Sequence, residues 1–295
     1  MPAAEPPLGF IVGGQAVIEG VMMRAPGGYC VAVRKPKGEI VLDCRKVPEK
    51  KWKVPVLRGT FVFFHALVLG IRALNFSASV VEEEGKEGKE GPAPLSQWAI
   101  AGSMLVALAF GVAIFVILPL ALTHWMKVKG SVAFNLVDGG IRLVLFFLYL
   151  GFITLFKDIR RIFAYHGAEH KVVHTYEARE DLTLENARTK SPLHPRCGTS
   201  FLLFVVVVSI VCFAFIPQSS PFAVKFGMRL LLLPLIGGIS YELIRLSHAL
   251  RNNPVGRAMA SPGMLLQRIT TREPDDSMLE VAIRSLQSAL DVARA

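Results

Sequence analysis

Three residues near the middle of the chain have the types and spacing of a metal site. His166, Glu169 and His170 form an H-x-x-E-H pattern within the stretch YHGAEHKVVHTYE. On a helix the positions i, i+3 and i+4 share one face, so two imidazoles can converge on a cation while the carboxylate points at its open coordination position. One class of zinc hydrolase uses this arrangement, and its glutamate activates a water molecule. The pattern predicts His166 and His170 as ligands and Glu169 as a catalytic base; caps and surface ion pairs of a polar helix are the alternative.

A second cluster with ligand chemistry follows in the stretch SPLHPRCGTSF, where His194 and Cys197 are flanked by two prolines and a glycine. The prolines restrict the backbone and hold both side chains in a defined turn. Imidazole and thiolate are both good zinc ligands, so either residue is a candidate for a third ligand. Alternatively, this segment is the turn that enters a helix, and Cys197 packs there as a small apolar residue.

Glu242 is a further candidate for the third ligand. It lies in an apolar stretch with Arg245 and His248 at three-residue steps, which places all three on one helical face. A carboxylate inside a membrane needs a cation, and both Arg245 and a bound metal qualify; a plain ion pair is the alternative. The residues that could support the site from outside are His174, Glu177, Glu19 and Arg245. The donor set predicts a divalent metal, with zinc the best match.

Long apolar stretches must position these residues. Of the 295 residues 52% are hydrophobic, and the formal net charge is +10, which predicts an α-helical integral membrane protein with basic exposed parts. About four transmembrane helices are expected, at roughly 97–122, 134–156, 198–216 and 226–249 within a membrane domain over 96–250. A further run, Gly59 to Leu74, contains His65 and Arg72 and is short. It predicts an interfacial or re-entrant helix over 58–80, with a fifth span as the alternative.

The flanking segments have the character of parts outside the membrane. Residues 1–57 predict a small β-rich part with a hairpin around KPKG, and the glycine-rich stretch Gly13 to Gly28 predicts a structural loop in preference to a nucleotide-binding one. Residues 81–95 are charged and rich in Gly and Pro, as in a flexible linker. The tail, 251–295, places Leu279, Ile283, Leu286 and Leu290 on one stripe, which predicts an amphipathic helix packed on the rest of this part.

Charge predicts the orientation. An even number of spans puts both termini and the motif segment 157–197 on one side, and most of the lysines and arginines outside the spans lie on that side. By the positive-inside rule this side is cytoplasmic. The four cysteines show no CxxC spacing and are expected to be thiols. Membrane lipids are the expected partners, possible further ones are other membrane proteins or a second copy of the chain, and no basic-aromatic platform for nucleic acid is present.

Four motifs in the same order resemble the YqhQ-like family of bacterial membrane proteins, which carries a domain of unknown function, number 1385. They are GGQAVIEGVMMRAP, YHGAEHKVVHTYE, HPRCGTSF and PGMLLQRITTREPDDSMLEVAI, and the resemblance runs from about Gly9 to Leu290. It implies a location in the bacterial inner membrane. The family has been described as a predicted metal-dependent enzyme, and this implies a site at His166, Glu169 and His170, with His194 and Cys197 as further members.

Three classes of function are consistent with these observations. The leading hypothesis is a metal-dependent hydrolase that acts on a membrane-associated peptide or lipid from the cytoplasmic face. The second is a non-enzymatic scaffold or regulator, in which a structural metal or a polar cluster ties loops to helices. The third is a small transporter, supported by Glu242 and Arg245 within the membrane and weakened by the lack of an internal repeat.

Overall fold

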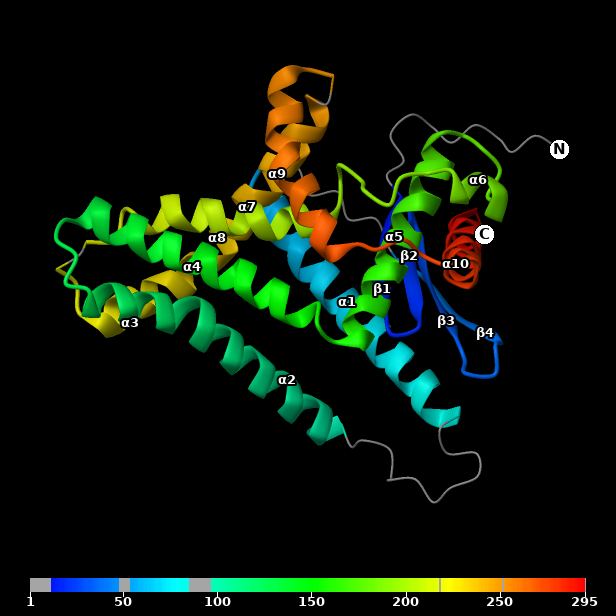
Figure 1. Ribbon diagram of the computed structural model, residues 1–295, viewed down its shortest axis with the longest axis horizontal. Coiled ribbons are helices and arrows are strands. Elements are labelled where there is room, and N and C mark those ends of the chain that lie inside the picture. The colour runs from blue at the N-terminus through cyan, green and yellow to red at the C-terminus, as the bar shows by residue number, and fades with distance from the viewer. Residues whose placement is uncertain (1–11, 48–53, 85–96, 218, 251, 295) are drawn as a thin grey trace.

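The protein consists of a helical bundle and of a sheet covered by helices, which lie side by side (Figure 1). The computed structural model describes residues 12–47, 54–84, 97–217, 219–250 and 252–294. The predicted linker over 81–95 lies mostly outside the described residues. The bundle helices α3, α4, α7 and α8 extend away from the sheet, so the two parts meet only at one end of the bundle.

The N-terminal part folds into a four-stranded antiparallel sheet of order β1-β2-β3-β4. The strands are β1 (Gly13–Val17), β2 (Gly20–Ala25), β3 (Gly28–Arg34) and β4 (Ile40–Lys46). The predicted hairpin is confirmed, because β3 and β4 pair directly and the turn between them contains Gly38 with a positive φ of 98°.

The glycine-rich stretch from Gly13 to Gly28 is a pair of strands, so the prediction of a loop was wrong. Gly14 and Gly20 serve close approach between strands, whereas Gly27, with a φ of 88°, lies in the turn between β2 and β3. A Cβ atom on Gly20 would lie 2.2 Å from the carbonyl oxygen of Ala32 in β3, and one on Gly14 would lie 2.2 Å from that of Met22 in β2. Only glycine lets these backbones come so near, which is a recognised use of glycine inside strands.

Helices cover the sheet on both faces. Successive side chains of a strand point to opposite faces, and in β3 Tyr29, Val31 and Val33 pack toward α1 (Leu57–Glu84), whereas Cys30 and Ala32 pack toward two other helices. These two helices are α5 (Lys157–Glu177) and α10 (Asp276–Arg294). The short helix α6 (Leu184–Arg188) follows α5 and contacts α10. The sheet is therefore the middle layer of a helix–sheet–helix arrangement.

Cys30 and Cys44 form a disulfide between β3 and β4. The strand register pairs these residues directly, with their Cα atoms 4.0 Å apart, so both sulfurs lie on the same face of the sheet. The expectation that all four cysteines are thiols was wrong for this pair, because it was based on spacing along the chain and not on strand register. Cys197 and Cys212 are free.

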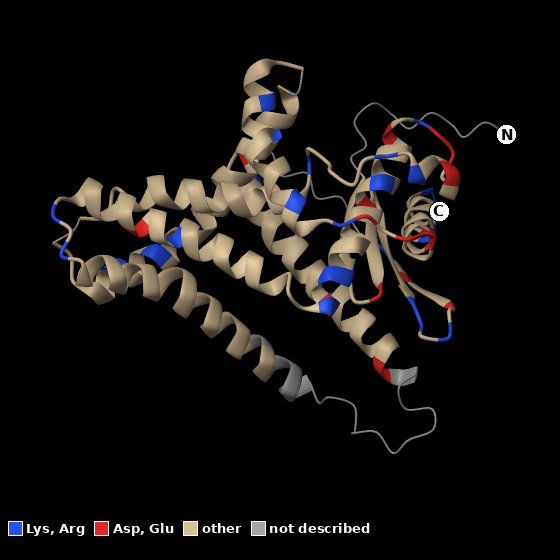
Figure 2. Cartoon of the chain, in the orientation of Figure 1, with Lys and Arg blue, Asp and Glu red and all other residues tan. Residues whose placement is uncertain are grey.

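The bundle contains most of the apolar helices. In chain order, the helices of the bundle are α2 (Gln97–Val112), the π-helical turn η1 (Ala113–Ile117), α3 (Leu118–Trp125), α4 (Ser131–Ile153), α7 (Gly198–Phe213), α8 (Phe222–Ala249) and α9 (Pro254–Thr270). Charged residues gather on the sheet part and at helix ends, and few lie along the bundle helices (Figure 2). The amphipathic helix expected in the C-terminal tail is confirmed as α10, which buries Leu279, Ile283 and Leu286 against the sheet part.

By length and composition, four helices among the described residues could cross a membrane. These candidates are Leu57–Glu82, Leu105–Trp125, Ser131–Ile153 and Phe222–Ala249. The predicted number agrees, but the membership differs. The expected third span, 198–216, is the helix Gly198–Phe213 of 16 residues, about 24 Å long at the usual helical rise, which is shorter than a bilayer core of about 30 Å.

The helix α1 replaces it among the candidates. The helix predicted over 58–80 is present with slightly wider bounds, and it is long enough to cross a membrane although the apolar run Gly59 to Leu74 is short. The helix continues through Asn75 to Glu84 and has 28 residues. Its first turns pack on α8, where Thr60 Oγ1 donates a hydrogen bond to the carbonyl of Pro234 (2.9 Å). Its later turns pack on the sheet, where Leu69 and Ala73 are buried. One continuous helix thus joins the bundle to the sheet part.

Candidate metal centre

The helix α5 presents the H-x-x-E-H motif toward the loop that leads into α7. His170 and Glu169 are buried, at 2% and 6% exposure. Gly167 on another face of the helix allows the chain after α9 to cross closely, because a Cβ atom there would lie 2.0 Å from the carbonyl oxygen of Arg272. The crossing chain is tied to α5 by the backbone hydrogen bond from Arg272 N to Phe163 O (2.9 Å). This crossing brings the end of α9 to the motif.

Two backbone carbonyls determine which ring nitrogen carries the proton in the two motif histidines, His166 and His170. His166 Nδ1 lies 2.8 Å from the carbonyl oxygen of Thr270, and His170 Nδ1 lies 2.6 Å from that of Pro192. A carbonyl only accepts, so each Nδ1 must donate its proton, and in each neutral ring Nε2 is left with a free lone pair. Metal-binding histidines show this arrangement, in which the second nitrogen donates to a carbonyl or carboxylate and fixes the ring.

Cys197 adds a sulfur to the two nitrogens. It is the N-cap residue of α7, and its Sγ accepts a hydrogen bond from the backbone N–H of Thr199 (3.3 Å). Cysteine binds metals through its sulfur atom, so this position makes Sγ available as a ligand atom. Sγ lies 3.1 Å from His166 Nε2. The alternative of a helix-entry turn and the ligand hypothesis are thus compatible, since Cys197 caps the helix and faces the histidines.

We call His166, His170 and Cys197 the inner group. Their ligand atoms, two imidazole nitrogens and one sulfur, all lie within 4.8 Å of one another. Ligand atoms around a tetrahedral zinc ion are separated by roughly 3.3–3.8 Å, as follows from the usual bond lengths. In the described part of the chain, His170 Nε2 is a buried nitrogen without a hydrogen-bond partner. Such a nitrogen is costly unless a ligand occupies it, so the donor set fits a metal ion.

Glu169 lies beside the inner group without belonging to it. One of its carboxylate oxygens is 3.5 Å from His170 Nε2. Its side chain packs against β1, where a Cβ atom on Gly14 would lie 3.1 Å from Glu169 Cγ. The glycine therefore makes room for a buried carboxylate. The position suits a group that accepts a proton next to the metal or that holds the histidine in place.

A second group consists of His174 and Glu177, which follow on the same face of α5, and His194 from the loop before α7, and it also has closely spaced ligand atoms. Its hydrogen bonds fit a metal less well. His194 Nδ1 accepts from the backbone N–H of Arg196 (3.2 Å), so Nε2 carries the proton and faces Glu177 (3.3 Å). Both nitrogens of His194 are thus engaged, and Arg196 forms an ion pair with Glu177. We call these residues the outer group and assign them a hydrogen-bonding role.

Burial changes the pKa values of the two histidines in the outer group. It lowers the pKa of His174 and that of His194, so their neutral forms are favoured. His174 Nε2 lies 2.9 Å from the carbonyl oxygen of Leu193, to which it donates. The neighbouring rings are in contact, with centroids 4.4 Å apart for His174 and His194. The outer group therefore fastens the loop 191–197 to α5.

Two polar residues of α9 complete this framework, and sequence reasoning missed both. Gln267 is fully buried; it accepts from His194 N (2.8 Å) and donates to His194 O (2.8 Å). Thr270 supplies the carbonyl that orients His166. The available signal was the presence of polar residues on the packed face of an amphipathic helix, within one of the four motifs that carry the family resemblance.

Three other residues expected at the site or around it, Glu242, Arg245 and Glu19, lie elsewhere, and Arg245 is exposed on α8. Glu242 pairs with Arg58 at the start of α1 (Nε to Oε1 2.7 Å), so it is neither a ligand of the inner group nor paired mainly with Arg245. The cause is the crossing of α1 over α8, which the sequence did not indicate. Glu19 pairs with Arg161 one turn before the motif and raises the pKa of that guanidinium. This ion pair holds the β1–β2 turn against α5, and the carboxylate of Glu19 does not extend to the histidines of the motif.

Comparisons with known proteins agree with the resemblance in the motifs. Residues 54–292 match the family model described as a protein of unknown function (DUF1385). The chain is similar to the uncharacterized protein YqhQ of Bacillus subtilis (strain 168), with 33% identity over 297 residues, which cover 94% of this chain and 92% of the relative. No solved structure matches. With most of its length matched in both comparisons, the chain belongs to the DUF1385 family of proteins of unknown function.

Proposed function

We propose that this protein is a membrane metalloprotein that binds one zinc-type divalent ion at the inner group and acts as a metal-dependent hydrolase on a membrane-associated substrate. One observation carries the proposal. His166 and His170 are fixed by carbonyls in the tautomer that leaves Nε2 free, and both free nitrogens face the capping thiol of Cys197. Three protein ligands leave a fourth position open, as in catalytic zinc sites.

The residues around the inner group have separable roles in this proposal. A bound zinc ion would act as a Lewis acid and would make a water molecule more acidic. Glu169 would accept the proton of that water, since its carboxylate is buried beside His170 and has space against Gly14. Cys197 begins α7, and α5 follows directly after α4, so the inner group lies where apolar helices leave the bundle. This position favours a peptide or lipid at the membrane surface as the substrate.

The membrane arrangement is part of the proposal. We infer a multi-pass protein of the bacterial cell membrane in which four segments cross, namely α2 to α3, α4, the shorter α7 and α8. Both termini and the inner group then lie on one side, which is cytoplasmic on the grounds of the charge distribution. We further infer that α1 lies along the membrane surface. Its later turns pack on the sheet, outside the apolar bundle, while its apolar residues between Phe61 and Val68 are exposed and can contact lipid. A helix that joins these two surroundings suits the boundary of the membrane.

Metal analysis of the purified full-length protein tests the proposal. We expect about one zinc ion per chain in the wild type and a loss of bound metal in the double variant His166→Ala/His170→Ala, because two of the three ligands are removed. The matched control is His174→Ala in the outer group, which should keep its metal because that histidine donates to Leu193 instead of facing the inner group. Inductively coupled plasma mass spectrometry provides the measurement.

Two results would contradict the assignment. The absence of stoichiometric metal from the wild type would exclude a metalloprotein. Loss of metal in His174→Ala, with retention in the double variant, would show that the ion binds at the outer group instead. Circular dichroism and size-exclusion profiles of each variant show whether the chain is still folded.

A scaffold or regulator is the second candidate, and the outer group favours it. Gln267 holds the backbone of His194 through both its N–H and its carbonyl, and Arg196 neutralises Glu177, so this cluster ties a loop and two helices together without any metal. The two functions differ in the coordination of the metal at the inner group. A closed set of four protein ligands would favour a scaffold, whereas three protein ligands and a water would favour an enzyme.

A further inference from the structure

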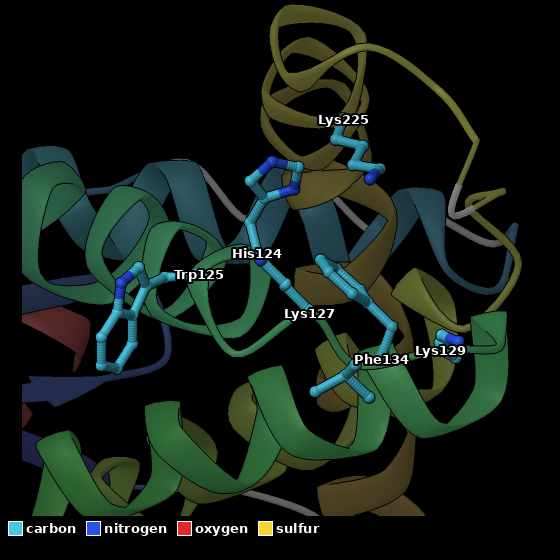
Figure 3. A pocket seen from close by; sticks show the side chains of 7 residues that line it. His124, Trp125, Lys127, Lys129, Phe134 and Lys225 are labelled. Carbon is cyan, nitrogen blue, oxygen red and sulfur yellow. The ribbon is translucent and has the colours of Figure 1, made fainter.

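A basic pocket lies at the end of the bundle that is remote from the inner group. It has a volume of about 460 Å³ and is formed by the end of α3, the α3–α4 connection and the first turns of α4 and α8. The residues that line it include four basic ones, His124, Lys127, Lys129 and Lys225, and the aromatic residues Trp125 and Phe134 (Figure 3). No lining residue is acidic.

Lys225 is the central feature of this pocket. Its side chain is buried, at 5% exposure, and its ammonium lies 4.7 Å from the ring centroid of Phe134. Among the described residues, this cation–π contact is the interaction the structure assigns to it, and no carboxylate pairs with it. A cation–π contact offsets only part of the cost of burying a charge, so an ammonium in this position calls for an anion.

The acidic residue nearest along the bundle is already neutralised. Asp138 is buried between two guanidinium groups, since its Oδ1 is 2.7 Å from Arg229 and its Oδ2 is 2.8 Å from Arg142. These three residues carry a net positive charge. Arg229 lies one helical turn after Lys225 on α8, so the wall behind the pocket is positive as well. This network therefore offers Lys225 no counter-ion, and the ammonium remains available to an anion from outside.

The surroundings of the pocket indicate the level of the lipid headgroups. Trp125 is 79% exposed at its rim, and tryptophan is enriched where a bilayer meets water. On the flanking helices Val132, Leu136 and Phe222 are exposed apolar residues, at 66%, 60% and 45%. Basic side chains above an apolar surface suit a molecule with an anionic phosphate and acyl chains.

We propose that this pocket binds the phosphate group of an anionic phospholipid, with Lys225 as the buried contact and Lys127 and Lys129 at the entrance. The site is separate from the inner group and does not depend on metal binding. Inorganic phosphate shares the same chemistry but would leave the apolar surface around the pocket uncovered. The phospholipid is therefore the ligand that the geometry favours.

Lipid binding to the full-length protein in detergent tests this proposal. Native mass spectrometry would compare phosphatidylglycerol, phosphatidylcholine and inorganic phosphate on the wild type, on Lys225→Met and on Lys157→Met. Lys157 is an exposed lysine at the start of α5, beyond the end of α4 that is remote from the pocket, so Lys157→Met is the matched control. We expect preferential binding of phosphatidylglycerol that weakens about tenfold or more in Lys225→Met, as for a lost charge-assisted hydrogen bond. Lys157→Met should bind as the wild type does.

A second variant keeps the test decisive if Lys225→Met fails to fold. The pair Lys127→Gln/Lys129→Gln changes only residues of the α3–α4 connection, and it should weaken phosphatidylglycerol binding several-fold and reduce its dependence on salt. Unchanged lipid binding in a folded Lys225→Met protein would overturn the proposal. So would unchanged binding in the double variant, or tighter binding of inorganic phosphate than of the lipid with the same dependence on Lys225.

Discussion

Two carbonyl groups determine how His166 and His170 face the inner group. Thr270 and Pro192 accept the Nδ1 protons, and each lies far from its histidine along the chain. In metal sites, hydrogen-bond partners of this kind orient the ring, so Thr270 and Pro192 would support the proposed ion without contacting it. The thiol of Cys197 has a similar support from the N-terminus of α7. At the scale of residues, the site is a set of three donors held by backbone groups.

Cobalt substitution tests the role assigned to Cys197. We expect the cobalt-loaded protein to show a sulfur-to-cobalt charge-transfer band in the near ultraviolet, and we expect Cys197→Ser to lose it and to weaken metal binding by about tenfold or more, because the thiolate ligand is gone. Cys212→Ser is the control, since Cys212 belongs to the bundle helix α7 and is remote from the histidines along that helix. Absorption spectroscopy and competition with a chelator provide the measurements.

The same cobalt sample distinguishes the two proposed functions. Addition of a small anion such as azide should change the visible spectrum if the fourth position is open. A spectrum that does not respond would indicate closed coordination and favour the scaffold. A charge-transfer band that persists in Cys197→Ser would show that Cys197 is not a metal ligand.

At the scale of elements, the crossing of α5 by the chain after α9 brings the site together. The crossing is possible because residue 167 has no side chain, so the carbonyl of Arg272 can approach the helix backbone. The same segment continues into α10, which packs on the sheet. Lys171 on α5 forms an ion pair with Glu273 in this segment. One short connection therefore positions Thr270 at the inner group and docks the last helix.

Replacing Gly167 by alanine should break this arrangement. The new methyl group would overlap with the carbonyl oxygen of Arg272, and overpacking of this kind costs about 1–3 kcal/mol, which corresponds to a drop of roughly 3–10 °C in the apparent Tm. Metal content should fall too, because the carbonyl that orients His166 moves. Thermal unfolding in detergent, followed by metal analysis, provides the measurement.

Gly151→Ala in α4 is the matched control for this prediction. A Cβ atom at Gly151 would meet no other atom within 4 Å, and alanine favours a helix more than glycine does, so its apparent Tm should be equal or higher. Equal Tm values for Gly167→Ala and the wild type would contradict the close crossing.

At the scale of the whole molecule, the two candidate sites lie at opposite ends of α4. The basic pocket is at the start of this helix, and α5 with the inner group follows its end. Two features bear on the orientation and point in opposite senses. The distribution of lysine and arginine favours the cytoplasm for the sheet part, whereas a disulfide such as Cys30–Cys44 is rare in that compartment.

Cysteine labelling in intact cells decides the orientation. Single cysteines would replace Ser191 near the inner group and Pro221 at the start of α8, both exposed, in a background with Cys197→Ser and Cys212→Ser. We expect a membrane-impermeant maleimide to label position 221 in intact cells and position 191 only after permeabilisation. Labelling of position 191 from outside would overturn the cytoplasmic placement of the inner group.

The sequence determined the local features of this protein, because they depend on neighbours along the chain. The apolar helices of the bundle, the β3–β4 hairpin and the amphipathic helix α10 all follow from periodicity and turn residues, and the structure agrees with them. The face shared by His166, Glu169 and His170 follows from helical spacing alone. Boundaries were less predictable, as the full length of α1 and the short α7 demonstrate.

Only the tertiary structure decided which of the candidate ligands meet. Crossing angles and strand register depend on packing between residues far apart in sequence. Because of this packing, Glu242 pairs with Arg58, and Cys30 forms a disulfide with Cys44. Asp138 lies between Arg142 and Arg229 for the same reason. The separation of the inner from the outer group depends on single hydrogen bonds to carbonyl and amide groups, which have no signature in side-chain spacing. The motif thus predicted that a site exists, and the tertiary structure determined which residues belong to it.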